Sequence, residues 1–389
     1  DAKERLGLPD NVPLVEPSDE QLRRWAVAIG LDYQAHCFHF GYLSRSEWQA
    51  QREWSLSFPW DEAPLLSILT PVHDPPLAFL RECFYSLQTQ SYPFWELCLV
   101  DDASQDEAVR AELAGFVARD ARVKLQRLDA NVGICDATNE ALGQASGRYV
   151  IFVDHDDRLA PNALDEVASH VLTDPHLDGI YSDRDLLTDE NYRIAPYFKP
   201  DWAPETLLSG NYMFHLTAYR RELVQALGGY RREYEGSQDL DLALRIAETD
   251  PAIRHIPRVL YHWRQHEGSM ALRPDAKPHI FDAGVRAVEA ALERRGMEGT
   301  VEEIPDIWRG NYRVRLRHGV DEPAVVRVED PSRYRDVVNA ALATCDREHL
   351  VVLGTGVEPV ASDTYQELAA WLDQPGIAGV TGRVLSSGG

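Results

Sequence analysis

The sequence predicts an α/β protein built around a doubly wound, mostly parallel sheet. Short apolar runs without polar alternation are typical of strands that are covered on both faces. Segments with helical periodicity separate these runs, as in proteins that alternate strand and helix. Acidic residues follow two of the runs, at the sheet edge where open α/β proteins bind their ligands. The alternation extends from Leu65 to Val153.

The apolar runs define the expected strands, and the segments with helical periodicity define the expected helices. The expected strands are 65–69, 95–100, 123–127 and 149–153, and the expected helices between them are 79–88, 107–119 and 133–145. Farther along, a helix is expected to open within 236–245, and residues 254–266 are expected to run as a strand into a loop rich in His and Trp. The repeated order of strand and helix predicts crossover connections and a common edge for the strand ends.

Composition and charge narrow the function classes. The 389 residues are 44% hydrophobic and 26% charged, which is ordinary for a globular protein. The formal net charge of −24 argues against a nucleic-acid partner and disfavours broad docking on anionic lipid. Five cysteines form no C-x-x-C pair, so buried thiols in a reducing compartment are expected.

No stretch reaches membrane-spanning length, and no signal peptide is recognised. A cytoplasmic location is therefore expected. Because the chain begins at Asp1 rather than at a methionine, we expect it to be part of a longer polypeptide.

The run at 149–153 is followed at once by Asp154-His155-Asp156-Asp157. Three carboxylates so close together repel one another unless something positive joins them. Oxygen ligands at the end of a buried strand suit Mg²⁺ or Mn²⁺ better than zinc. The alternative is an acidic turn that solvates its charges or caps the next helix, and this motif alone does not decide between the two. The strand at 95–100 also ends in two acids, at 101 and 102, so the two strand ends together outline a pocket.

A nucleotide at this edge would need its diphosphate neutralised by a metal. The chain has neither a G-x-G-x-x-G after the first strand nor a G-x-x-x-x-G-K-[ST], so dinucleotide and P-loop interpretations are weak. Farther along, Asp239 lies at the start of an expected helix, where the motif taken alone favours a simple helix cap.

Taken together, six short motifs in order resemble an inverting family 2 glycosyltransferase with the GT-A (Rossmann-like) fold, over roughly residues 61–300. Within the family, the resemblance is to bacterial enzymes that build O-antigen, capsule or other surface glycans, whose Phe-Lys-Pro-Asp-Trp stretch stands at 198–202. The motifs are Ser67-Ile-Leu-Thr-Pro-Val-His-Asp74, Glu96-Leu-Cys-Leu-Val-Asp-Asp-Ala-Ser104, Asn131-Val-Gly133 with Thr138-Asn139, Tyr149-Val-Ile-Phe-Val-Asp-His-Asp-Asp157, Gly236-Ser-Gln-Asp239 and Tyr261-His-Trp-Arg-Gln-His266.

The resemblance implies a role for each matching position. Asp239 occupies the position of the catalytic base, although Gln238 stands where many members carry Glu. Asp156 is implied to bind Mn²⁺ or Mg²⁺ directly, with Asp154 contacting the ribose or a metal-bound water. His266 lies where some members place a further metal or diphosphate contact. The donor site is implied to include Thr70, Pro71, Asp102 (accepting from the base), Asn139, Asp154, His155 and Asp156.

The implied reaction transfers a sugar from a nucleotide-diphosphate sugar to a glycan or lipid-linked oligosaccharide. A metal stabilises the leaving group, and one carboxylate takes the proton of the acceptor hydroxyl. With one base and no enzyme nucleophile, displacement inverts C1. Acceptor candidates are Trp202, Asn211, Gln238 and Trp263. Peripheral association with the inner membrane or with other glycan-synthesis enzymes is expected.

Three segments are expected: a helical arm at 1–60 with a helix at 21–29, the transferase domain at 61–300, and an α/β module at 301–389. The module resembles the later half of a second transferase domain, with helices at 333–343 and 364–372 and strands at 350–353 and 377–380. Gly354-Thr-Gly-Val-Glu-Pro359 replaces its acidic motif, so a degenerate packing or docking module is expected.

Two rival functions are open. The first is a non-catalytic glycan- or nucleotide-binding scaffold within a glycan-synthesis complex. The second is a metal-dependent nucleotidyltransferase or phosphatase, which would leave Asp239 and the stretch 261–266 without a role. The acids Asp154, Asp156 and Asp239 favour an active sugar transferase over both.

Overall fold

The computed structural model describes residues 45–57, 63–266, 279–304, 309–317, 323–347, 349–354, 357 and 364–374. By their contacts, the residues divide into two compact units. The first is Asp1–Leu207 with Asn211–Gly284, and the second is Leu208–Gly210 with Val285–Gly389. The expected helix at 21–29 lies outside the described residues, and of the expected arm only residues 45–57 are described, as helix α4 (Arg45–Leu56).

The first unit alternates strand and helix as far as its acidic loop and then becomes less regular. Its strands are β1 (Leu66–Val72), β2 (Trp95–Asp101), β3 (Val123–Arg127), β4 (Tyr149–Phe152), β5 (Arg158–Leu159), β6 (Gly179–Leu187), β7 (Arg193–Tyr197), β8 (Thr217–Arg220) and β9 (Ile253–Arg264). Its helices after α4 are α5 (Leu77–Gln88), α6 (Glu107–Arg119), α7 (Ile134–Gln144), α8 (Ala163–Thr173), α9 (Arg221–Ala226) and α10 (Gln238–Ala247), with short 3₁₀ turns at Pro204–Ser209 and Arg232–Tyr234.

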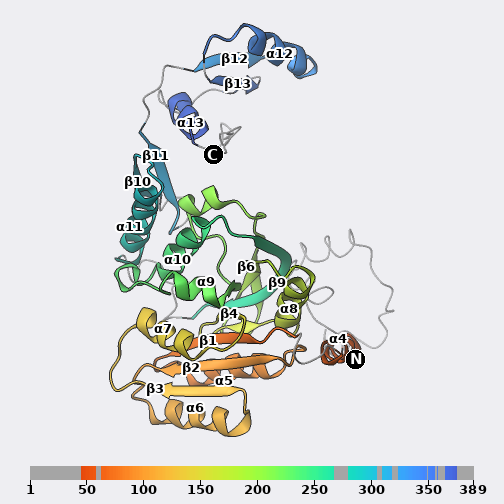
Figure 1. The fold of residues 1–389 in the computed structure, drawn as a ribbon, viewed down its shortest axis with the longest axis vertical. Coiled ribbons are helices and arrows are strands. Elements are labelled where there is room, and N and C mark those ends of the chain that lie inside the picture. The colour runs from red at the N-terminus through yellow and green to blue at the C-terminus, as the bar shows by residue number, and fades with distance from the viewer. Residues whose placement is uncertain are drawn as a thin grey trace. The chain divides into compact units, whose positions relative to one another are not determined.

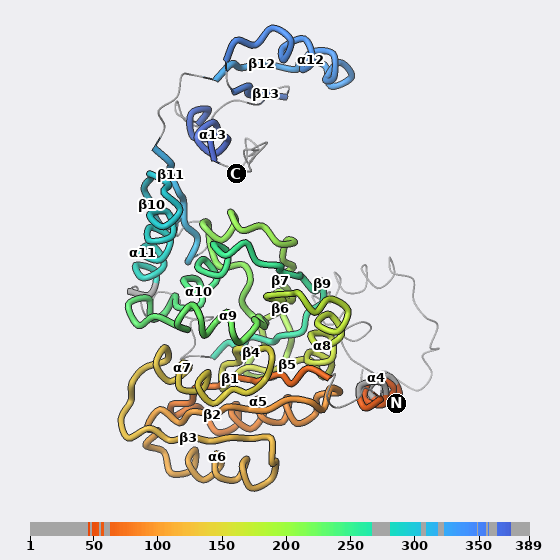
Figure 2. Tube along the Cα trace, in the orientation of Figure 1, coloured from red at the N-terminus to blue at the C-terminus, as the bar shows by residue number. Residues whose placement is uncertain are grey.

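These strands form one nine-stranded sheet in the order β3-β2-β1-β4-β8-β6-β9-β5, with β7 paired to β6 (Figures 1 and 2). Strand β1 pairs in parallel with β2 on one side and with β4 on the other. The connection from β3 through α7 to β4 reverses the direction in which strands are added. The topological switch point, where such sheets bind ligands, therefore lies between the carboxyl ends of β1 and β4.

Helices cover both faces of this half of the sheet, which explains its continuous apolar strands. The right-handed crossovers place α5 and α6, which contact one another, on one face, and α7 packs on β1 and β2 from the other. All seven residues of β2 are buried as a result. Phe84 of α5 stacks on Phe116 of α6, with ring centroids 3.8 Å apart, inside the same core.

The α/β fold class is confirmed, and the sheet is mixed rather than mostly parallel. Strand β8 runs antiparallel to both β4 and β6, and β5 and β7 are also antiparallel to their partners. Strand β6 contains Ser182-Asp183-Arg184-Asp185, which is too polar to be identified from apolar runs. The elements at 65–153 and α10 and β9 agree with the predicted ones except at their ends.

Helix α10 is fixed to the first unit through a buried carboxylate. Asp241 has no exposed surface and pairs with Arg231 and Arg245. Arg245, only 6% exposed, also donates to the main-chain carbonyl oxygens of Leu227 and Gly229, at 2.7 Å each. This network fixes the start of α10, and with it Asp239, against the segment at 227–231.

The second unit holds two small sheets. Strands β10 (Gly299–Glu303) and β11 (Tyr312–Leu316) are antiparallel, whereas β12 (Ala324–Val328) and β13 (Leu350–Gly354) are parallel and joined by α12 (Tyr334–Thr344). Helix α11 (His279–Arg294) contains the point of division between the units, and α13 (Thr364–Leu372) follows β13. The helices predicted at 333–343 and 364–372 and the strand at 350–353 are confirmed, and the strand predicted at 377–380 lies outside the described residues.

Two smaller predictions concern thiols and membrane spans. Cys83, Cys98 and Cys135 are buried and free, and Cys345 is half-buried, whereas Cys37 lies outside the described residues. Among the helices that the structure describes, none combines the length and the apolar character needed to cross a membrane.

We predict that Asp241→Ala destabilises the protein by about 3–5 kcal/mol, because it leaves the buried guanidinium of Arg245 without its carboxylate. Urea denaturation followed by circular dichroism measures the free energy of unfolding. Asp250→Asn is the control: Asp250 is exposed, and asparagine tolerates its positive φ of 53°. A loss below ~1 kcal/mol for Asp241→Ala would contradict the role given to this ion-pair network.

Candidate active site

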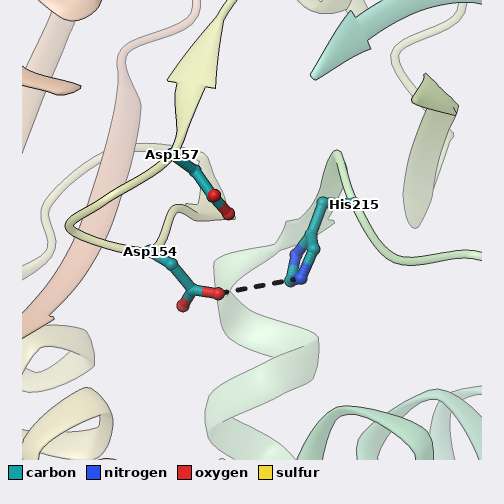
Figure 3. Close-up of side chains that lie close together, drawn as sticks. All are labelled: Asp154, Asp157 and His215. Atoms are coloured by element: carbon teal, nitrogen blue, oxygen red, sulfur yellow. Dashed lines mark ion pairs between the residues drawn. The ribbon is translucent and has the colours of Figure 1, made fainter. Parts of the chain in front are cut away.

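The acidic loop leaves β4 at the switch point of the sheet. Asp154 and Asp157 lie on this loop, and His215 faces them from the segment that precedes β8 (Figure 3). Each of the three offers one ligand atom, and these atoms all lie within 4.8 Å of one another. The predicted acidic strand end is therefore a compact cluster of possible ligands. His215 is an addition that the sequence did not indicate.

Asp157 anchors the loop. It has no exposed surface: its Oδ2 accepts a hydrogen bond from the Tyr261 hydroxyl at 2.5 Å, and its Oδ1 accepts one from the Arg264 main-chain N–H at 2.7 Å. The same Tyr261 hydroxyl accepts a bond from the main-chain N–H of Asp154 at 3.3 Å. Burial and the charges of the neighbouring acids raise the pKa of Asp157 well above its usual range. Its oxygens are thus committed to binding β9.

Arg264 ties the same loop down with its side chain. The guanidinium is fully buried; its Nε donates to the carbonyl oxygen of Asp156 at 2.8 Å, and it pairs with Glu82 at 2.6 Å. It also lies over the ring of Phe79, 4.4 Å from the centroid. One residue of β9 therefore holds the acidic loop through both its main chain and its side chain.

Asp156 pairs with His266, the residue that follows β9 by two positions. The distance from His266 Nε2 to Asp156 Oδ2 is 2.9 Å, and the two side chains are 17% and 18% exposed. Hydrogen bonding to Asp156 raises the pKa of His266. Although burial opposes it, the hydrogen bond from His266 and the nearby positive charges lower the pKa of Asp156. The structure thus joins two residues 110 positions apart that the sequence analysis assigned to one metal site.

Asp154 is the most accessible acid of the loop, with 39% of its side chain exposed. Its Oδ2 lies 3.8 Å from Nε2 of His215. Within the described ranges, the carboxylate accepts no hydrogen bond from another residue. The pKa of Asp154 is raised to about 7, mainly by burial and further by the negative charges of Asp156 and Asp239. A cation placed here would relieve this repulsion.

Asp239 approaches the cluster from the first turn of α10. It is half-buried, its Oδ1 accepts a hydrogen bond from the Leu240 main-chain N–H at 2.9 Å, and the side chain of Asn211 also hydrogen-bonds to it. Burial raises the pKa of Asp239 to about 6 despite these bonds. The negative charge of Asp239 contributes to the raised pKa of Asp154, so the two carboxylates lie near one another although they are far apart in the sequence.

The residues predicted for the nucleoside side line the ends of β1 and β2. Thr70 is buried, and its hydroxyl oxygen has no partner among the described residues. The carbonyl oxygen of Pro71 lies 3.1 Å from Nδ1 of His155, which joins β1 to the acidic loop. The carboxylate of Asp102 accepts the main-chain N–H groups of Val132 and Gly133, at 2.7 and 3.0 Å. Direct contact between Asp102 and a nucleobase stays a prediction.

Of the remaining predicted residues, two have side chains that hydrogen-bond to the main chain. Both ends of the Asn139 amide bind the main chain of Tyr230, at 2.8 Å each, and a side chain at Gly229, where φ is 68°, would collide with that amide. Gln238 Oε1 accepts from the Gly236 N–H at 2.6 Å. Their roles toward donor and acceptor stay predictions.

The two predicted acceptor tryptophans differ in placement. The ring of Trp263 lies 6.1 Å from that of His215, at the edge of the acidic cluster. Trp202 is half-buried, and in the described part of the chain no hydrogen bond or ring contact links it to these carboxylates.

Several residues of the site carried no separate signal in the sequence. His215 is a lone histidine in a connecting segment, and it stacks on Tyr261 with ring centroids 4.7 Å apart. The buried Lys199 Nζ donates to the carbonyl oxygens of Met213 and His215, at 2.9 and 2.7 Å, and so fixes that segment. Tyr261, Arg264 and Lys199 lie inside quoted motifs, but only the fold reveals what each one touches.

Comparison with known proteins identifies a family whose model matches part of this chain. Residues 67–228 match the family model described as Glycosyl transferase family 2. An O-antigen biosynthesis protein, RfbC, of Myxococcus xanthus is 36% identical over 80% of this chain and 24% of its own length. An uncharacterised protein, y4gI, of Sinorhizobium fredii is 32% identical over 82% of this chain and 42% of its own length. The chain thus spans about a quarter of the first relative and less than half of the second.

Among solved structures, a Pyrobaculum calidifontis mannosyltransferase in complex with GDP-Man and Mn²⁺ is similar with a TM-score of 0.46 and 21% identity. The similarity covers 70% of this chain and 79% of that one.

The raised pKa values predict that the acidic cluster costs stability at neutral pH when no metal is present. In the folded state the pKa values of Asp154 and Asp239 are about 7 and about 6, whereas the ordinary value is 3.8. At a pH between the ordinary and the folded pKa, each of these acids therefore binds more protons in the folded state than in the unfolded state. The contribution of each acid to stability therefore falls as pH rises through this window. We expect Asp154→Asn and Asp239→Asn to raise the free energy of unfolding in EDTA, and to raise it more at pH 7.5 than at pH 5.

Urea denaturation of the wild type and both variants at the two pH values measures this difference, and the titration of other groups cancels in the comparison. An equal effect of the substitutions at both pH values would contradict the raised pKa values.

Proposed function

Residues 67–228 form a glycosyltransferase family 2 domain carried on a GT-A fold, and from this premise we propose that the chain transfers a sugar from a nucleotide-diphosphate sugar with inversion at C1. The proposed reaction is assisted by a divalent metal and uses Asp239 as the base. The proposed donor site lies at the switch point between β1 and β4. The activity of the longer relatives as whole proteins is a separate matter, since this chain spans only part of them.

The observation that carries the proposal is the meeting of two kinds of carboxylate in one half-buried site. Asp154 and Asp156 stand at the end of β4, where the charge of a donor diphosphate must be neutralised. Asp239 stands at the start of α10 and interacts electrostatically with Asp154. A phosphatase or a binding scaffold would use Asp154 and Asp156 but would give no function to the half-buried Asp239 with its raised pKa.

The acids of the loop, together with the imidazoles of His215 and His266, fit a hard divalent cation. Within the described chain, the carboxylate of Asp154 accepts no hydrogen bond, and Asp156 has one oxygen that is not paired with His266. Carboxylates with one imidazole, from His215 or His266, are suitable ligands for Mn²⁺, and carboxylates alone for Mg²⁺. When bound, the ion supplies neutralisation of the diphosphate leaving group. Asp157 and Arg264 keep the loop in place for that purpose.

Asp239 acts on the acceptor in this proposal. Its carboxylate takes the proton of an acceptor hydroxyl as that oxygen bonds to C1, while the bond from C1 to the diphosphate oxygen breaks. A pKa of about 6 leaves Asp239 largely ionised at neutral pH and yet a better base than an ordinary aspartate. Asn211 orients the carboxylate by a side-chain hydrogen bond. A single base acting on the acceptor gives direct displacement, and hence inversion.

The acceptor is proposed to be a glycan or a lipid-linked oligosaccharide of surface polysaccharide synthesis. Similarity to RfbC of Myxococcus xanthus, whose name refers to O-antigen biosynthesis, supports this class. The ring of Trp263, one of the proposed acceptor residues, lies 6.1 Å from that of His215, which faces the acidic loop. A cytoplasmic location with peripheral attachment at the inner membrane, or attachment to other glycan-synthesis enzymes, completes the proposal.

The base assignment is tested by Asp239→Asn. Asparagine still accepts the Leu240 N–H and keeps the start of α10, but it cannot take a proton. We expect sugar transfer, or donor hydrolysis if the acceptor is not in hand, to slow by at least ~100-fold. Binding of UDP with Mn²⁺ should stay close to that of the wild type. Near-normal turnover would leave Asp239 with a structural role only.

The metal assignment is tested by thermal melting. UDP or dTDP should raise Tm much more with Mn²⁺ than with EDTA, because binding to the folded state alone stabilises it. Asp156→Ala should abolish this difference while preserving the fold. The control is Glu107→Ala, which removes an exposed acid from α6 and should keep the full Mn²⁺ effect. Equal stabilisation with EDTA and with Mn²⁺ would refute a metal-assisted donor site.

A further inference from the structure

Arg184 carries a half-buried positive charge that no acid of the described chain neutralises by contact. It lies in β6, opposite Tyr261 of β9 and Tyr197 of β7. Its Nε is buried without a hydrogen-bond partner, and no carboxylate of the described residues lies within 4.0 Å of its guanidinium. The buried Arg193, Arg245 and Arg264, by contrast, are paired with Asp185, Asp241 and Glu82. Leaving a desolvated cation unpaired is costly, so such a group is expected to bind an anionic partner beyond the described residues.

The acids closest to Arg184 in the chain do not supply this partner. Asp183 Oδ1 accepts the Lys199 main-chain N–H at 2.9 Å and lies 2.8 Å from Nε2 of His255. Asp185 is bound by Arg193 and His262, at 2.6 Å each. Asp157, whose charge acts on Arg184, uses both of its oxygens to hold β9. None of these three acids forms an ion pair with Arg184.

Aromatic rings flank the guanidinium instead. Its central carbon lies 4.8 Å from the ring centroid of Trp263 and 5.2 Å from that of Tyr197. Tyr197 is 40% exposed, and the next residue, Phe198, is 63% exposed. Exposed aromatic faces of this kind suit the C–H faces of sugar rings. Charge and stacking surface are thus combined at one place.

This place adjoins the proposed reaction centre. The ring of Trp263 lies 6.1 Å from that of His215, and His215 Nε2 lies 3.8 Å from a carboxylate oxygen of Asp154. Arg184 is therefore separated from the acidic loop by two side chains.

We propose that Arg184, flanked by Trp263 and Tyr197, binds the carboxylate of a uronic acid residue beside the reaction centre. A guanidinium matches the planar carboxylate with two parallel hydrogen bonds, and the rings receive the sugar to which the carboxylate is attached. The uronic acid belongs either to the donor or to the terminal part of the acceptor. The proposal deepens the proposed function and rests on it, since the site it names is a subsite of the transferase.

The test compares carboxylate ligands with their neutral counterparts on the full chain. Isothermal titration calorimetry measures the affinity for UDP-glucuronate against UDP-glucose with Mn²⁺ in the donor arm. In the acceptor arm it measures an oligosaccharide of alternating glucuronate and N-acetylglucosamine against its carboxyl-reduced form. The wild type should prefer the carboxylate ligand in one arm by about 10- to 100-fold, as expected for a charge-assisted hydrogen bond. The arm in which the preference appears identifies the source.

Arg184→Met should abolish this preference and keep the affinity for the neutral ligand, whereas Arg184→Lys should retain part of the preference. Arg119→Met is the control, because Arg119 makes a similar contact, 5.2 Å from the ring centroid of Phe116 on α6. No carboxylate preference of the wild type in either arm would overturn the proposal. An equal loss of affinity for the carboxylate ligand and the neutral ligand in Arg184→Met would also overturn the proposal, since that result is expected if Arg184 only packs against its neighbours.

The Tm shift produced by UDP with Mn²⁺ reports separately on the proposed function. If that shift is absent while a carboxylate preference depends on Arg184, the donor site is wrong and the uronate subsite stands. If the shift is present without any carboxylate preference, the subsite is wrong and the donor site stands.

Discussion

The site depends on one constraint: three carboxylates that repel one another must be held at the end of a single strand. The burial of Asp157 meets this constraint, because the Tyr261 hydroxyl and the Arg264 main chain take up its two oxygens. Arg264 adds a bond to the carbonyl oxygen of Asp156, and its own charge is balanced by Glu82 of α5. The acidic loop is thus tied to β9 and, through Arg264, to α5 before any ligand arrives.

Because Asp157 anchors the loop, the acids of the motif have different roles. Since Asp157 holds the loop, Asp154 and Asp156 can present oxygen atoms toward the switch point of the sheet. Their mutual repulsion remains, and with burial it raises the pKa of Asp154 to about 7. Stored repulsion of this kind weakens the fold at neutral pH, and a bound cation would release it.

Two further cationic side chains act on His215. Lys199 is buried against the carbonyl oxygens of Met213 and His215, and Arg184 lies between Trp263 and Tyr197. Burial and these two charges hold the pKa of His215 well below its usual range. The imidazole is thus neutral and has a lone pair to offer to a cation.

The sequence alone determined the alternating elements from 65 to 153, the edge at which the acids gather, and the family resemblance that nominated Asp154, Asp156 and Asp239. Those features are local, since apolar runs, helical periodicity and short motifs each lie within a few residues of chain. The antiparallel part of the sheet, the anchoring role of Asp157, and the places of His215, Lys199 and Arg184 were decided only by the tertiary structure. The physical reason is that their partners are remote: Tyr261 and Arg264 lie more than 100 positions from Asp157, and no local pattern encodes which side chains such distant segments bring together.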